Sequence, residues 1–498
     1  MSNLIYNGYA VTDEQQVTID WAHDKGSQKI EACAGAGKTS TLGAISETLM
    51  LQGKRGLYIA FNKSIAEEAQ NKMPHNVTAR TAHSLAYREC AIPFQQAGKL
   101  GRCYPSVIAR ELRIAPIQPM TATSVADVVL SAVTKFCYSA DDEISEQHVN
   151  MYDFAKAGFD NNDMLSIRLT LLSYARLLWE RMLRLNDPMP ITHDVYLKVW
   201  CLSKPVLNYD FILFDEAQDA NPVLVDLVQR QHASLMFVGD RYQQIYSWRG
   251  ATNAMQNVQI QTNNLTQSFR FGQNVAGVAN EILRTQLDVD SNIRGFDDIT
   301  SDIARLDIDN VDCIISRTNA GLFKNIFNAV DAGKSCYVNG GVYPILSLFE
   351  GISRLQSGNR SDHSDLRIFT NYMEFTEFTE SAAGSDMKVP MKLIAEHGLD
   401  SLINTIKKVQ YIKKDNADYV LTTAHKSKGL EWPRVRLDSD FKMMPDKSEN
   451  AKVDPFNTWK PEEANLLYVA STRAKLTLDC SRVADIAHLC GELAEEAA

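Results

Sequence analysis

The chain has 498 residues, a formal net charge of -10, 45% hydrophobic residues and 22% charged residues. This length suggests about three to four domain-sized units, and the composition excludes a wholly disordered chain. The negative net charge excludes a uniformly basic surface. Nucleic-acid binding is still possible, because it needs only local positive charge in a channel.

The cysteine pattern and the first residues indicate an intracellular protein. The nine cysteines form no Cys-x-x-Cys pair and are odd in number, so neither a zinc module nor a secreted disulfide framework is indicated. Segment 1–16 lacks a basic stretch followed by an apolar one, and no uncharged apolar run approaches the ~20 residues that span a bilayer. We expect a soluble, cytoplasmic chain without a membrane segment.

Short apolar runs rich in β-forming residues recur along the chain, each followed by a polar or glycine-containing turn and a helical pattern. The runs are 29–33, 57–61, 211–215, 235–239, 313–316, 336–340, 419–424 and 476–480. Runs separated by helices are typical of parallel, doubly wound sheets, so we predict an α/β fold.

Two long stretches break this rhythm. Residues 86–204 have apolar positions at helical spacing, and residues 351–414 are polar and mixed, with an exposed loop expected at 357–365. We interpret the first as a mostly helical insertion and the second as a small accessory insertion, each within one of two sheet domains. The predicted division gives 1–85 and 205–262 to the first sheet domain, and 263–350 and 415–498 to the second.

The segment ACAGAGKTS at 32–40 follows a predicted strand and opens a helix. It matches the phosphate-binding pattern GxxxxGK[ST] with Ala32 in the first glycine place. Gly35 and Gly37 allow backbone N–H groups to turn toward phosphate oxygens, Lys38 supplies a cation, and Thr39 supplies a hydroxyl for Mg²⁺. A small-residue helix start that happens to contain Lys-Thr is the competing interpretation, and the preceding strand disfavours it.

The segment FILFDEAQD at 211–219 places two carboxylates after an apolar strand. Open α/β sheets bind ligands at this end of their strands. Asp215 suits a Mg²⁺ shell, and Glu216 suits a general base that orients or deprotonates the attacking water. An acidic helix cap is the alternative. Together with the phosphate loop the pair favours nucleotide hydrolysis, although a small-molecule kinase or a GTPase also fits these two motifs.

Further motifs narrow the choice. In chain order the set is TDEQQ (12–16), AGAGKT (34–39), AFNKSIAEEA (60–69), TAHSLAY (81–87), DEAQD (215–219), VGDRYQQIYSWRGA (238–251), LTQSFRFGQNV (265–275), SRTNA (316–320), TTAHKSKGLEW (423–432) and EEANLLYVASTRAK (462–475). It resembles the ordered motif set of the UvrD/Rep group of superfamily 1 DNA helicases over about residues 12–480. The sequence of segments 61–70 and 81–87 is especially similar to that of the F-box DNA helicase branch and its phage and bacterial relatives, although no F-box is apparent.

The resemblance implies two RecA-like domains that bind ATP and Mg²⁺ between them. Gln15 would read the adenine, Phe269 would stack on the base, and Gln243 would sense the γ-phosphate. Arg270 and Arg473 would reach the γ-phosphate from the second domain. The expected sets are Gln15, Ala34, Gly35, Ala36, Gly37, Lys38, Thr39, Ser40, Phe269 and Glu431 for the nucleotide, Lys38, Glu216, Gln243, Arg270 and Arg473 for catalysis, and Thr39 and Asp215 for the metal.

Single-stranded DNA would run along a second set of residues. Aromatic rings stack on bases regardless of sequence, and polar groups hold phosphates. The resemblance implies stacking at Tyr246 and Trp248. It implies polar contacts at Asn62, Lys63, Thr81, His83, Arg249, Arg317, Asn319 and His425. Core packing is the alternative for Trp248, and a structural role is an equally weighted alternative for His83 and His425.

Some positions depart from the family pattern or have no assigned role. An aromatic residue often lies two places before the asparagine of the second motif, whereas Phe61 lies one place before Asn62, which leaves its stacking role open. Ala82 replaces the usual aromatic of the next motif. Segment 351–414 is short beside the auxiliary domain of the long relatives. Asp240, Arg241 and Gln244 are not assigned.

The predicted function is that of an ATP-dependent single-stranded DNA translocase and helicase, moving 3′ to 5′ as the resemblance implies. Its DNA partners would be single strands and duplex junctions, with replication, recombination or defence proteins as candidate protein partners. A bacterial or phage-infected cell, near the nucleoid, is the expected location, and the oligomeric state stays open, a monomer included. A translocase that strips proteins from DNA, a nucleotide-dependent switch subunit and an RNA helicase are the alternatives.

Overall fold

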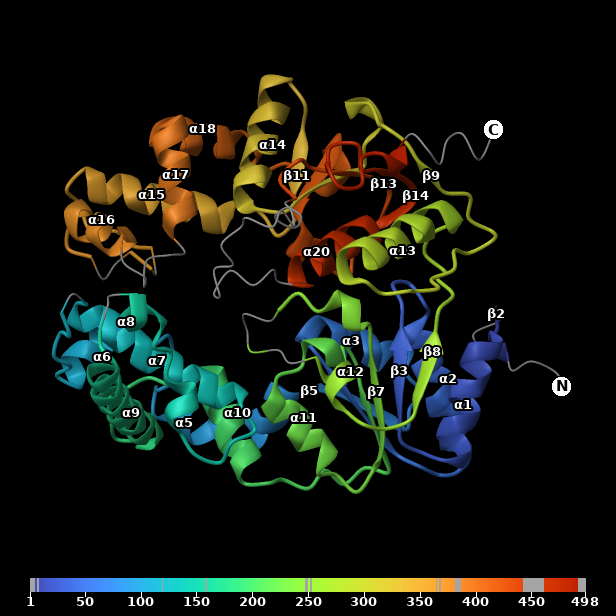
Figure 1. The fold of residues 1–498 in the computed structure, drawn as a ribbon, viewed down its shortest axis with the longest axis horizontal. Helices are drawn as coiled ribbons and strands as arrows, with labels where there is room; N and C mark the ends of the chain where they lie inside the picture. The colour runs from blue at the N-terminus through green and yellow to red at the C-terminus, as the bar shows by residue number, and fades with distance from the viewer. Residues whose placement is uncertain are drawn as a thin grey trace.

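The computed structural model describes residues 5–6, 9–118, 120–156, 159–246, 250, 253–363, 365–366, 369–380, 387–441 and 461–490. Two six-stranded sheets organise the chain, and every pairing within them is parallel. In Figure 1 the sheets lie one above the other, with helices on both faces of each. The predicted α/β fold with two doubly wound sheets is confirmed.

The first sheet has the strand order β5-β4-β6-β7-β3-β8. Its strands are β3 (Gln28–Ala32), β4 (Gly56–Ala60), β5 (Val77–Thr81), β6 (Phe211–Phe214), β7 (Ser234–Gly239) and β8 (Thr262–Leu265). Its helices are α1 (Asp13–Asp24), α2 (Lys38–Leu51), α3 (Lys63–Lys72), α11 (Pro222–Gln229) and α12 (Ala254–Asn257). A short antiparallel pair, β1 (Ile5–Tyr6) and β2 (Tyr9–Ala10), precedes α1.

The second sheet has the order β11-β12-β10-β13-β14-β9. Its strands are β9 (Asp302–Ile303), β10 (Cys313–Ser316), β11 (Cys336–Val338), β12 (Tyr419–Thr423), β13 (Trp432–Leu437) and β14 (Ala474–Asp479). Its helices are α13 (Gln273–Leu287), α14 (Asn319–Asp331), α19 (Ala424–Ser427) and α20 (Pro461–Ser471).

All eight predicted apolar runs lie on strands, but four strands of the two six-stranded sheets have no predicted run. They are β5, β8, β9 and β13. Strand β9 has only two residues, and the others carry polar side chains, as in VTART at 77–81 and TNNL at 262–265. Each pairs with a neighbouring strand, β13 with a register shift between Trp432 and Arg434, so the sheet supplies the stability that their composition does not.

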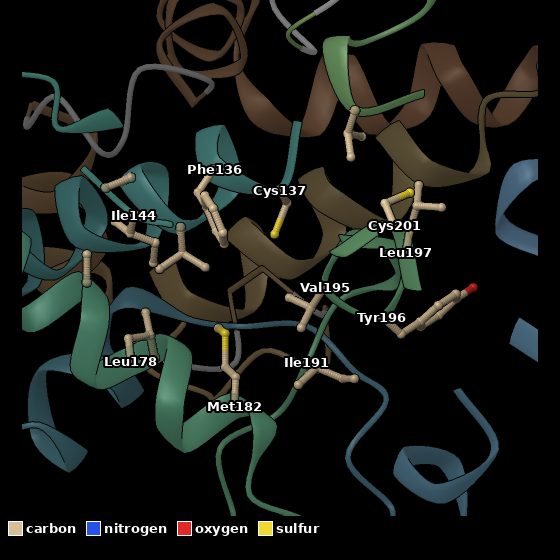
Figure 2. Packing of buried hydrophobic residues seen from close by; sticks show 14 of the residues in the cluster. Phe136, Cys137, Ile144, Leu178, Met182, Ile191, Val195, Tyr196, Leu197 and Cys201 are labelled. Carbon is tan, nitrogen blue, oxygen red and sulfur yellow. The ribbon is translucent and has the colours of Figure 1, made fainter. Parts of the chain in front are cut away.

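Residues 86–204 are largely helical, as predicted. The helices are α4 (Ala82–Ala86), α5 (Ile92–Gln96), α6 (Pro105–Glu111), α7 (Ala122–Tyr138), α8 (Tyr152–Lys156), α9 (Asn161–Leu183) and α10 (His193–Leu202). Figure 2 shows Phe136 of α7 and Leu178 of α9 among the packed apolar side chains. This core is continuous with one face of the first sheet, where Leu57 and Ile212 are fully buried.

Residues 351–414 differ from the mixed polar segment that the sequence predicts. Helices α15 (Tyr343–Gln356), α16 (Tyr372–Glu380), α17 (Lys388–His397) and α18 (Leu399–Val409) fill most of this region. They bury Phe349, Phe375 and Leu402 in a common core with the second sheet. In each helix, apolar residues recur every three to four positions and charged residues lie between them. The mean composition of the segment is therefore polar, although each helix has an apolar face. Within the described residues, none of the helices has the length and apolar character needed to cross a membrane.

Candidate functional site

A glycine-rich turn joins β3 to α2 at the carboxyl edge of the first sheet. Gly35 and Gly37 have φ angles of 77° and 74°, in the left-handed region that favours glycine. A Cβ atom at Gly35 would lie 2.6 Å from Cβ of Arg270 and 2.7 Å from Oγ of Ser268. Glycine therefore allows the turn to open backbone N–H groups toward an anion, and it allows segment 268–270 to approach closely.

A cavity of about 430 Å³ lies over this turn, between the two sheets. Most of the predicted nucleotide and catalytic residues line it together. They are Gly35, Ala36, Gly37, Lys38, Thr39, Ser40, Glu216, Gln243, Phe269, Arg270, Glu431 and Arg473. The first six come from the turn and α2, whereas the last four come from the chain beyond β8.

Three predicted residues lie beside this cavity rather than in its lining. Gln15 is buried, and its Nε2 donates to Oγ1 of Thr41 at 3.0 Å and would lie 3.2 Å from a Cβ at Gly37. Ala34 is buried beneath the turn. Asp215 lines the neighbouring cavity.

Glu216 lies between two lysines. Its Oε1 is 3.5 Å from Nζ of Lys38, and its Oε2 is 3.4 Å from Nζ of Lys428. Burial alone would raise the pKa of Glu216, but Lys38 and Lys428 lower it to about 2. The carboxylate is therefore ionised near neutral pH. Its φ of 51° is left-handed, a conformation that costs a non-glycine residue energy and is often found at functional positions.

Asp215 is held by its neighbours. The hydroxyl of Tyr58 donates to its Oδ2, and the backbone N–H of Glu216 donates to Oδ1 at 2.9 Å. Burial and the charge of Glu216 raise the pKa of Asp215. Carboxylate and hydroxyl oxygens are the ligands that Mg²⁺ takes in proteins, so the donor types of Asp215 and Thr39 fit this ion.

Two arginines approach the cavity from the second sheet. Nε of Arg270 donates to Oε2 of Glu431 at 2.9 Å, and Glu431 also accepts from Lys475 at 3.0 Å. Arg473 is 1% exposed and donates to the carbonyls of Val469 and Leu430. No carboxylate forms an ion pair with Arg473 among the residues that the structure describes. Burial and the nearby charge of Arg270 lower the pKa of Arg473 to about 9. A buried, unneutralised cation of this kind fits an anionic ligand.

The loop after β7 connects the cavity to the second sheet. Asp240 accepts from Nε2 of Gln243 at 2.8 Å and from the hydroxyl of Tyr468 at 2.9 Å. The carbonyl of Gln244 accepts from Nδ2 of Asn465 at 2.9 Å. Tyr468 and Asn465 both lie on α20, so Asp240 and Gln244, which the sequence left unassigned, link the first sheet to that helix.

Arg241, the third unassigned residue of the loop, pairs with Glu31 on β3 at 2.8 Å. Trp248 and Arg249 lie outside the described residues, so their predicted DNA contacts stay predictions.

Lys428 is the clearest residue that the sequence did not single out. Its side chain is 11% exposed, its Nζ pairs with Asp219 and Glu216, and it donates to the carbonyl of Gln243 at 2.8 Å. The same nitrogen lies 5.5 Å from the ring centroid of Tyr246. Burial would lower the pKa of Lys428, but the two carboxylates raise it. One cation from the second sheet thus contacts two loops of the first, the one after β6 and the one after β7.

We expect Lys428→Met to lower the urea midpoint of unfolding. The substitution leaves Asp219, whose side chain is 1% exposed, without its cation. Breaking a buried pair by removing one partner costs about 3–5 kcal/mol. Lys426→Met is the control because Lys426 lies on α19, the short helix that Lys428 caps at its C-terminus, and is exposed. Equal midpoints for the two variants would show that the buried pair adds no stability.

A second cavity of about 430 Å³ adjoins the first. The two cavities share Phe61, Asn62, Glu216, Asp219 and Tyr246. His83 also lines the second cavity, and its Nε2 lies 3.1 Å from Oδ1 of Asp194. The side chains of Asn62 and Thr81 cap α3 and α4 by accepting from backbone N–H groups. Both have this structural role in addition to the predicted one.

The structure also bears on whether Phe61 can stack on a base, which the sequence left open. Its side chain is 39% exposed, and its ring stacks on Tyr246 with centroids 5.6 Å apart and an interplanar angle of 16°. The ring of His425, from the second sheet, lies 6.1 Å from that of Tyr246. Lys63, at the start of α3, and Asn319, at the start of α14, are exposed. An aromatic pair with a cavity on each side can support a stacked base.

We expect Phe61→Ala to weaken binding of single-stranded DNA. Base–aromatic stacking is worth about 1–3 kcal/mol per base, which corresponds to roughly a five- to hundredfold change in Kd. Fluorescence anisotropy with a labelled oligothymidylate measures the change. Phe61→Tyr is the matched control because it keeps the ring. If the alanine variant binds as tightly as the tyrosine variant, Phe61 does not stack on a base.

Comparison with known proteins gives two family matches, one in each half of the chain. Residues 12–263 match the UvrD/REP helicase N-terminal domain, and residues 359–483 match the UvrD-like helicase C-terminal domain. The chain belongs to the UvrD/REP helicase family. The resemblance seen in the ordered motifs is thereby confirmed.

Individual proteins with similar sequences show how much of the chain is matched. F-box DNA helicase 1 of Gallus gallus is 31% identical over 497 residues, which cover 94% of this chain and 48% of that protein. F-box DNA helicase protein 1 of Schizosaccharomyces pombe is 30% identical over 516 residues, covering 95% and 57%. A probable DNA helicase II homolog of Mycoplasma pneumoniae is 36% identical over 89 residues, covering 16% and 12%. The chain spans about half the length of the two F-box relatives.

Proposed function

We propose that this UvrD/REP family member is an ATP-dependent DNA helicase that moves along single-stranded DNA in the 3′ to 5′ direction. One observation carries the proposal. A cavity lined by the phosphate turn, Glu216 and two arginines of the other sheet shares an aromatic pair with a second cavity. The same side chains would therefore respond to the bound nucleotide and contact the DNA. The family assignment and the names of the relatives support the choice of DNA as the substrate.

ATP would bind between the two sheets. Lys38 would hold the β- and γ-phosphates, and Phe269, which is 37% exposed, would stack on the base beside Gln15. Mg²⁺, held through Thr39 and Asp215, would neutralise charge on the phosphates. Glu216 would orient the attacking water. Arg270 and Arg473 would stabilise the charge that develops on the γ-phosphoryl group.

Hydrolysis would then change the grip on DNA through the contacts between the sheets. Lys428 contacts Glu216 and the carbonyl of Gln243, and its ammonium group lies over the ring of Tyr246. Loss of the γ-phosphate would weaken the hold of the arginines, so the sheets would separate. The ring of Tyr246 would move with the loop after β7 and would change its stacking on Phe61, which follows β4.

An unwinding assay with 3′-tailed and 5′-tailed duplexes, with and without ATP, tests this proposal. We expect strand separation only with ATP and only from the 3′-tailed duplex. ATP hydrolysis is measured in parallel with and without single-stranded DNA. Turnover indifferent to DNA would contradict a motor and favour a nucleotide-dependent switch. Stimulated turnover without unwinding would favour a translocase that strips proteins from DNA.

A further inference from the structure

Glu463 holds the side chain of Arg317 at the carboxyl edge of the second sheet. Nε of Arg317 donates to Oε2 of Glu463 at 2.6 Å, and Nη2 donates to Oε1 at 2.5 Å. Both side chains are partly exposed, at 24% and 31%. Two parallel N–H···O bonds are the geometry in which an arginine takes either a carboxylate or a phosphate. One edge of the guanidinium is therefore already occupied by an anion.

The backbone under Arg317 is fixed independently of Glu463. Oδ1 of Asp440 accepts from the N–H of Arg317 at 2.7 Å. Oδ2 of Asp440 accepts from the N–H and the hydroxyl of Thr318, each at 2.8 Å. Because these bonds hold the turn between β10 and α14, the side chain of Arg317 can change partner without a change in the backbone.

The pair lies next to residues of the proposed DNA path. Strands β10 and β12 pair in parallel with Ser316 opposite Thr423, so Arg317 and the imidazole of His425 follow neighbouring strand ends, and α20, which carries Glu463, packs against α19, which carries His425. The same imidazole lies beside Tyr246, which lines the second cavity. Glu463 therefore places a negative charge where a phosphodiester, also negative, would approach Arg317.

We propose that Glu463 competes with a DNA phosphate for Arg317 and thereby weakens the grip of the second sheet on single-stranded DNA. The inference rests on the proposed function and concerns the control of that same DNA site. Arg317 has an anionic partner in both states, and the carboxylate of Glu463, whose side chain is 31% exposed, is solvated by water when Arg317 leaves it. A motor must release each phosphate after holding it, and an internal competitor makes release easier.

The test measures binding of the full chain to a labelled oligothymidylate at several salt concentrations, without nucleotide. We expect Glu463→Gln to lower Kd several-fold and to slow dissociation. Its plot of log K against log salt concentration should steepen by about 0.7, the value for one further phosphate contact on a single strand. The gain should disappear when Glu463→Gln is combined with Arg317→Gln, because the residue freed by the first change is then absent.

Glu462→Gln is the matched control. It removes one negative charge from the same turn of α20, at the neighbouring position. We expect a smaller gain in affinity that persists in the Arg317→Gln background, since it reflects general charge alone. Should Glu463→Gln lower the melting temperature, Glu463→Asp keeps the charge with a shorter reach, and we expect an intermediate gain in affinity.

Three outcomes overturn the inference in different ways. If Glu463→Gln binds DNA equally well or more weakly, Glu463 orients Arg317 toward the strand and does not compete with it. If the unaltered protein does not bind single-stranded DNA, the proposed function fails and the inference fails with it. A gain that survives in the Arg317→Gln background would also count against competition.

Discussion

Replacing Lys38 by alanine is expected to reduce ATP turnover by at least about 10²-fold, the cost of removing one preorganised donor to a transition-state charge. Lys38 is the first residue of α2 and lines the cavity beside Glu216. Burial alone would lower its pKa, but Glu216 and Asp215 raise it, so the ammonium group stays charged at neutral pH. A phosphate-coupled assay of ATP hydrolysis measures the loss.

The control for this experiment is Lys72→Ala. Lys72 ends α3, and its side chain is 58% exposed and pairs only with Glu68 among the described residues. Its loss is expected to leave turnover unchanged, because exposed pairs contribute little. Since Lys38→Ala also leaves buried carboxylates without a cation, circular dichroism must show that the variant is folded. Turnover by a folded Lys38→Ala variant would refute the phosphate site.

Most of the candidate site could be predicted because its residues follow strands in short motifs. The turn at 33–37 and the carboxylates at 215–216 each come directly after a buried strand. In parallel sheets these strand ends meet at one edge, so local sequence is enough to bring Lys38 and Glu216 together. Arg270 and Arg473 were predicted in another way, from the resemblance to the family's motif set, which implies that both reach the site from the second sheet.

The contacts that connect the two sheets could not be predicted in this way. Lys428 and Asp219 are 209 positions apart in the chain, and Tyr468 and Asp240 are 228 apart. No periodicity marks such pairs, because their partners are brought together only by the docking of one sheet on the other. Tyr58 was missed for a related reason. It lies inside a strand whose other side chains are apolar, and its hydroxyl matters only because β6 places Asp215 beside it.

Residues 351–414 show a different limit of prediction from sequence. The helices of this segment were not predicted because its charged residues dominate the average, although Leu402 and Ile406 on α18 are fully buried. Burial of one helical face is visible in the sequence only when each helix is read separately at a spacing of three to four residues.

Glu216→Gln is expected to retain ATP binding and to lose hydrolysis. Glu216 is ionised at neutral pH because Lys38 and Lys428 outweigh the effect of burial on its pKa. Glutamine keeps the size and the oxygen that can contact water, but it removes the charge that orients the water and can accept its proton. General-base catalysis contributes about 10²–10⁴-fold, and turnover should fall by that factor.

Binding of a fluorescent ATP analogue separates the two effects of this substitution. We expect Kd to change little, because the phosphate turn, Lys38 and Arg473 are intact. Glu68→Gln on the exposed face of α3 is the control for a general change in charge, since its side chain is 61% exposed. Unchanged hydrolysis would remove Glu216 as the base and would leave two other carboxylates as candidates, Asp215, whose charge acts on Lys38, and Asp219, which pairs with Lys428. A parallel loss of nucleotide binding would instead assign Glu216 to holding the lysines in place, because both ammonium groups depend on its charge.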